Sequence, residues 1–89
     1  MPYIKQEDRT KYTKITNQIY DLKEIENKGD LEYLIFVLMQ KFMSTREKRY
    51  STLHEVVYAT MHCADEYRRR FLDKREDEAK ETNGDIYGK

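Results

Sequence analysis

Apolar residues recur at helical spacing in three parts of the chain. In the first part they lie three and four positions apart, which predicts an amphipathic helix over residues 6–28. Gly29 follows Lys28 and suits the left-handed position at which many helices end, so we expect this helix to end there. The residues of the stripe are Tyr12, Ile15, Ile19, Leu22 and Ile25.

The second apolar pattern begins directly afterwards. Asp30 can accept hydrogen bonds from the free N–H groups of a first helical turn, and the repeat predicts a helix that ends near Met43 or Ser44. A helix that is apolar nearly all round belongs in a core or between subunits. The main stripe consists of Leu31, Leu34, Ile35, Leu38, Met39 and Phe42, and it is widened by Tyr33, Phe36 and Val37.

A polar, basic connection over residues 44–51 leads to the third pattern. Thr52 and Glu55 have the spacing of a capping box, which predicts one long helix from Thr52 to about Glu81. Its apolar stripe fades after Leu72, so the charged end would extend past the other helices unless a partner packs there. The stripe consists of Leu53, Val56, Val57, Thr60, Met61, Ala64, Tyr67, Phe71 and Leu72.

Together these elements predict an all-α fold. We expect a small three-helix domain over residues 1–82, in which a helical hairpin packs on one long C-terminal helix, and a short tail over residues 83–89. Domains of this size bury little surface, and the second helix has too few polar positions for a solvent-exposed helix. We therefore predict a homo-oligomer, with a dimer as the first expectation.

Composition narrows the range of partners. Hydrophobic and charged residues each make up 38% of the chain, and 17 basic residues cancel 17 acidic ones. A neutral chain has no global field that would draw it to nucleic acid or to an anionic membrane. No apolar run approaches the roughly 20 residues that span a bilayer. The single cysteine, Cys63, excludes an intramolecular disulfide and suits a reducing cytoplasm, and we expect it to be a small buried residue.

Five short motifs occur in order along nearly the whole chain. They are Met1-Pro2-Tyr3-Ile4, Gly29-Asp30-Leu31-Glu32-Tyr33-Leu34-Ile35, Tyr50-Ser51-Thr52-Leu53-His54-Glu55-Val56, Tyr67-Arg68-Arg69 and Asn83-Gly84-Asp85-Ile86-Tyr87. Their order and spacing resemble a family of small proteins of unknown function found in phages and bacterial genomes. The resemblance implies a phage or prophage setting and a helical fold, and it transfers no catalytic residue.

The chain departs from that family at two places. His54 stands where the family more often has asparagine. The stretch Arg70-Phe71-Leu72-Asp73 replaces a segment that contains a proline in the family, so we expect this helix to continue without a break.

Four residues spaced four apart form one polar stripe on the third helix: His54, Tyr58, His62 and Glu66. His62 and Glu66 could hold a metal ion, and either histidine could act as an acid or base. A solvated or partner-facing surface is the commoner role of such a stripe. Because no third ligand clusters with His62 and Glu66, we predict neither a metal nor a cofactor.

The carboxylates permit comparison with all-helical nucleotide pyrophosphohydrolases, which bind magnesium through acidic pairs on facing helices. Mg²⁺ needs clustered oxygen ligands. Glu55, Asp65 and Glu66 do not have the required spacing, so an enzyme of this kind is the weakest hypothesis.

Tyrosines and arginines are the remaining candidates for recognition. Consecutive arginines at positions 68–70 fan around a helix, so at most one or two could bind one phosphate, and neighbouring carboxylates are the alternative partners. The 8 tyrosines could stack on bases or act as hot spots of a protein interface. We predict a ligand- or partner-binding site that consists of Tyr50, His54, Tyr58 and Arg69.

Two classes of function follow. The first is a non-catalytic phage- or prophage-type protein that binds a host or phage protein, for example to counteract a host system. The second is a protein that sequesters a small anionic, nucleotide-like signal. The first hypothesis predicts an exposed patch and the second a pocket, and we favour the first because the sequence contains no phosphate-binding loop.

Overall fold

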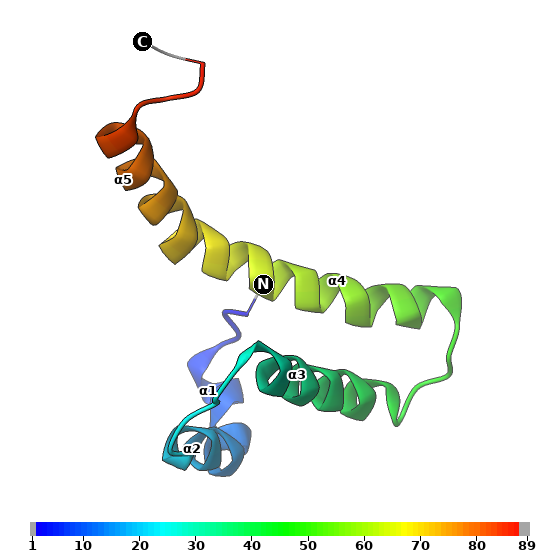
Figure 1. Ribbon diagram of the computed structural model, residues 1–89. Coiled ribbons are helices and arrows are strands. Elements are labelled where there is room, and N and C mark those ends of the chain that lie inside the picture. Colours follow the sequence, from blue (N-terminus) through cyan, green and yellow to red (C-terminus); the bar gives the residue numbers. More distant parts are fainter. Residues whose placement is uncertain (1, 88–89) are drawn as a thin grey trace.

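The computed structural model describes residues 2–87, and these residues form an all-α fold (Figure 1). The predicted fold class is confirmed: two helical parts of the N-terminal half lie against a long C-terminal helix. The elements are α1 (Gln6–Arg9), the 3-10 turn η1 (Thr10–Tyr12), α2 (Thr13–Asp21), α3 (Lys28–Met43), α4 (Tyr50–Tyr67), the π-helical segment η2 (Arg68–Leu72) and α5 (Asp73–Asn83).

The predicted C-terminal end of the first helix, at Lys28, is wrong. The helical run ends at Asp21, and residues 22–27 form no helix. The Asn27 side chain accepts a hydrogen bond from the Asp30 N–H at 2.9 Å and caps α3. Gly29 therefore lies in the first turn of α3 instead of ending the preceding helix, and Asp30 is not the cap. Asn27 competes successfully because its short amide reaches the free N–H three residues on.

The packing of α3 along α4 forms the small core. Met43 of α3 and Val56 of α4 are the two buried hydrophobic residues of the described chain, each with 7% of its surface exposed. α3 ends at Met43, as predicted. Around these two residues lie half-buried side chains from both helices: Ile35, Met39, Phe42, Thr52 and Thr60.

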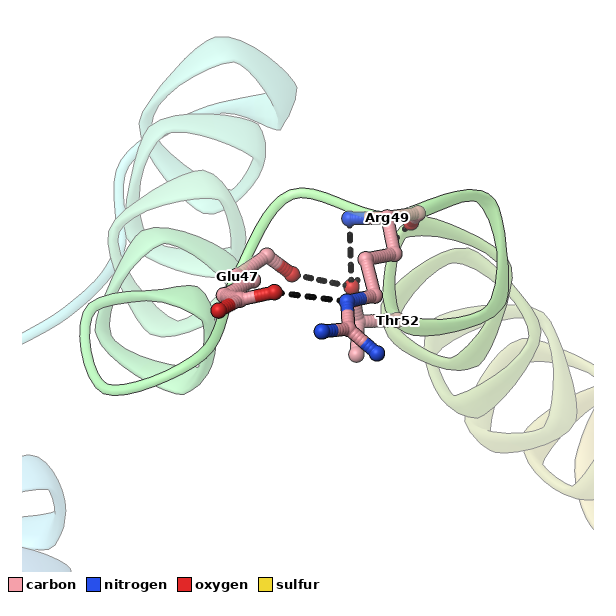
Figure 2. A network of polar contacts seen from close by, with 3 residues as sticks. All are labelled: Glu47, Arg49 and Thr52. Carbon is pink, nitrogen blue, oxygen red and sulfur yellow. Dashed lines mark hydrogen bonds and ion pairs between the residues drawn. The ribbon is translucent and has the colours of Figure 1, made fainter.

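The α3–α4 connection is held by a polar network of Glu47, Arg49 and Thr52 (Figure 2). The Thr52 hydroxyl accepts from the Arg49 N–H at 3.1 Å and donates to the Glu47 carbonyl, while Arg49 Nε donates to the Glu47 carboxylate at 2.6 Å. α4 therefore begins at Tyr50, with Arg49 as its cap residue. The prediction that Thr52 starts the helix is wrong, because its hydroxyl bonds back to the chain before the helix.

The long C-terminal helix bends between α4 and α5, where Figure 1 shows the change of direction. Residues Arg68–Leu72 form a π-helical turn, a feature that commonly bends helices. The expected uninterrupted helix is therefore corrected: the chain stays helical to Asn83 but bends without a proline. Gly84, with a φ of 92°, ends α5. The last two residues of the predicted tail lie outside the described residues.

Several residues expected in the core are exposed. Cys63 is exposed rather than buried, because it lies beside the small α3–α4 contact and not within it. Tyr12, Tyr33 and Tyr67, which belong to the predicted apolar stripes, are also exposed in the single chain. α5 buries no residue at all. Within residues 2–87, no helix has the length and apolar character needed to cross a bilayer.

Candidate functional site

Four rings form a continuous row along α4, which we call the aromatic ladder: Tyr50, His54, Tyr58 and His62. The ring centroids lie 5.0 Å apart for Tyr50 and His54, 4.3 Å for His54 and Tyr58, and 6.3 Å for Tyr58 and His62. Residues four apart are neighbours on a helix, so the sequence spacing itself brings these rings together. The ladder therefore needs no loop to hold it, and its rungs share the rigidity of the helix.

The ladder borders a shallow, open hollow on the surface of α4. All four rings line it, and Phe42, the last aromatic residue of α3, contributes to one edge. Arg46 lies over the Phe42 ring, with its guanidinium carbon 3.7 Å from the ring centroid. A shallow surface that combines aromatic rings with a nearby cation is typical of contacts with another macromolecule rather than of an enclosed ligand pocket.

A second hollow continues the surface toward the bend, and His62 borders both. Here Arg69 donates two hydrogen bonds to Glu66, from Nε to Oε1 at 2.6 Å and from Nη2 to Oε2 at 2.9 Å. Such paired bonds fix the plane of both groups. The Glu66 side chain is only 12% exposed, whereas that of Arg69 is 69% exposed.

The Glu66 carboxylate is stabilised in its charged form. The hydrogen bond from Arg69 is the main cause, and one from the Tyr3 hydroxyl adds to it; together they lower the pKa of Glu66 to about 2. The same pair raises the pKa of Arg69. Glu66 is therefore held in an ion pair with Arg69, and its carboxylate is not free to bind a metal or to transfer a proton.

Tyr3 joins the N-terminal segment to the bend of the long helix. Its hydroxyl accepts a hydrogen bond from Arg70 Nη1 at 2.8 Å, between residues that lie 67 positions apart in the sequence. The three consecutive arginines therefore point to three different partners, since Arg68 pairs with Asp65 at 3.2 Å. The fan of arginines follows from the sequence, but the role of Tyr3 does not, because no local pattern reveals a contact across the whole chain.

The predicted site residues fall into two groups. The rings of Tyr50, His54 and Tyr58 contact one another in turn along α4 and line one hollow. Arg69 lies in the adjacent hollow and is hydrogen-bonded to Glu66. His62, which belongs to the predicted polar stripe but not to the predicted site, connects the two. Among residues 2–87, no group of three or more histidine, cysteine, aspartate or glutamate side chains is arranged to hold a metal ion.

A family model described as a domain of unknown function (DUF6899) matches residues 1–86. The chain belongs to this family. The DUF6899 match spans the first four of the motifs quoted above and the closing Asn-Gly-Asp-Ile, and it ends one residue before Tyr87. Searches of curated proteins and of solved structures give no significant match.

Proposed function

We propose that this chain is a non-catalytic protein-binding module that recognises its partner through the aromatic ladder. One observation carries the proposal: three ring-to-ring contacts join Tyr50, His54, Tyr58 and His62 into one exposed row on a long helix. Tyrosine is enriched among the residues that dominate binding energy at protein interfaces. Its large ring has few rotatable bonds, so it is ordered on binding at a small entropic cost.

The shape of the surface supports a protein partner over a small anion. The hollow beside the ladder is open, and among residues 2–87 no arginine or lysine lines it; Arg46 approaches it only at the Phe42 edge. Arg69, which lines the adjacent hollow, already holds Glu66 in a bidentate pair, so its charge is offset locally. A nucleotide-like ligand would have to compete with that carboxylate for the guanidinium. The alternative function, sequestration of a nucleotide-like signal, is therefore the second choice.

The biological setting of the proposal comes from the motifs that resemble phage- and bacteria-encoded proteins. In this proposal the module acts in the cytoplasm of a bacterial host, as a phage- or prophage-type protein whose partner is a host or phage protein. Interference with a host system is the role that such a setting favours. Nothing in the proposal requires catalysis, a metal or a cofactor.

Site-directed photocrosslinking in a bacterial host tests the proposal. A benzophenone-bearing phenylalanine replaces Tyr58 in one version of the protein and Tyr20 in another. Tyr20, on α2, is the matched control because it is an exposed tyrosine outside the ladder. We expect a light-dependent adduct with a discrete protein from position 58 and none from position 20.

Two results would contradict the proposal. One is the same set of adducts from both positions, which would show random collisions. The other is a large thermal stabilisation by nucleotides or cyclic nucleotides that is lost in Arg69→Ala, because it would establish the small-anion alternative. A circular dichroism spectrum that matches that of the wild type shows that each variant keeps its fold.

A further inference from the structure

The side of α3 that faces away from α4 is apolar and uncovered. We call this surface the outer face of α3, and it consists of Tyr33, Leu34, Val37 and Leu38. Tyr33 is 68% exposed and Leu38 is 59% exposed, although both are large hydrophobic residues. Core-facing Met39 and Met43 lie on the opposite side of the same helix. A helix with such a face is normally buried on both sides.

The single chain exposes far more surface than a compact monomer of the same mass. A compact monomer of 10.9 kDa exposes about 5,600 Å², whereas this chain exposes 8739 Å². Its radius of gyration is 17.4 Å, against about 12 Å for a compact domain of this length. The surplus of about 3,100 Å² exceeds the roughly 800 Å² per partner that a standard stable interface buries.

The charges at the two ends of this face identify the partner. Residues 33–40 carry no charge, while Asp30 stands before them and Lys41 after them. Eleven residues are close to three whole turns, so Asp30 and Lys41 lie on the same side of α3, at opposite ends of the outer face. An antiparallel copy of α3 would place each Asp30 opposite the Lys41 of the other copy.

We propose that a second copy of this chain covers the outer face of α3, with the two α3 helices antiparallel across a two-fold axis. In this register Leu34 meets Val37 of the second copy, and Tyr33 meets Leu38. A two-fold interface brings each surface patch against itself, so a charged centre would oppose its own charge. The uncharged centre and the oppositely charged ends avoid that repulsion.

Sedimentation equilibrium of the wild-type chain at micromolar concentration is the first test. The proposal predicts a mass of twice 10.9 kDa. A folded monomer at these concentrations would overturn it, and so would any assembly other than a dimer. This measurement needs no variant, so it does not depend on the folding of a substituted chain.

A matched pair of valines then tests the face itself. Val37 on the outer face is 45% exposed, and Val57 on α4 is 47% exposed. Val37→Lys would bury two unpaired charges beside the two-fold axis and should weaken dimerisation by at least about 100-fold. Val57→Lys should leave the dimer intact. Equal effects of the two substitutions would overturn the assignment.

A charge exchange tests the antiparallel register. Lys41→Glu places like charges at both ends of the interface and should weaken dimerisation by about tenfold at low salt. The double substitution Asp30→Lys with Lys41→Glu should restore the wild-type dissociation constant. Failure of the double variant to recover would overturn the antiparallel register.

Discussion

Val56→Ala is the substitution that tests most sharply where this chain is held together. Val56 is one of two buried hydrophobic residues in the described chain, and it lies where α4 contacts α3. Its neighbour Val57 is 47% exposed and faces another side of the same helix. The two valines thus share residue type, helix and sequence context, and differ mainly in burial.

The expected effects follow from burial and helix propensity. Val56→Ala removes two buried carbon groups, which costs about 1.6 kcal/mol, and the cavity left behind adds about 1 kcal/mol. The higher helix propensity of alanine offsets about 0.6 kcal/mol. The net loss is therefore about 2 kcal/mol. For Val57→Ala the lost burial is only about half as large, about 0.8 kcal/mol, so propensity nearly cancels it and the net change is close to zero.

Urea unfolding followed by far-ultraviolet circular dichroism measures both variants. All samples need the same protein concentration, because self-association contributes to apparent stability. We expect a clear decrease in the unfolding midpoint for Val56→Ala and almost none for Val57→Ala. Similar midpoints for the two variants would refute the conclusion that the α3–α4 contact forms the core.

Two further predictions concern the polar contacts that position the helices. The folded-state pKa of Glu66 is about 2, against an ordinary value of 4.5. Its contribution to stability is therefore present above pH 4.5 and is lost as the pH falls toward 2. Glu66→Gln should reduce this loss of stability at low pH, measured by urea unfolding at each pH, whereas the matched control Glu55→Gln should retain it. Asn27→Ala should destabilise the chain by about 1 kcal/mol through loss of the α3 cap, whereas Asn17→Ala within α2 should not, and an equal loss in both would argue against a cap at Asn27.

The features that could be predicted from the sequence depend on local periodicity. The end of α3 at Met43 follows from its apolar repeat, and the neighbouring rings of His54 and Tyr58 follow from a spacing of four residues on α4. Tyr50 is expected in the connection before the helix, but it forms the first residue of α4 and so extends the ladder. Such spacings determine which side chains are neighbours before any tertiary contact forms.

Prediction from the sequence fails where two local signals compete or where a contact joins distant parts of the chain. Asn27 and Gly29 both mark helix boundaries, and the hydrogen bond from Asp30 N–H to the Asn27 side chain decides between them. The contact of Tyr3 with Arg70 joins residues 67 positions apart, which no periodicity can indicate. The π-helical turn at Arg68–Leu72 contains no proline, so the sequence carries no signal of the bend.

The affinity of the crosslinked partner for two tyrosine variants tests the central claim most directly. The partner captured at position 58 is purified, and its dissociation constant is measured for the wild type, Tyr58→Ala and Tyr20→Ala. If the aromatic ladder is the recognition surface, Tyr58→Ala should weaken binding by at least about tenfold, and Tyr20→Ala should bind like the wild type. Unchanged affinity in Tyr58→Ala, with an intact helical spectrum, would contradict the assignment of the ladder as the binding site.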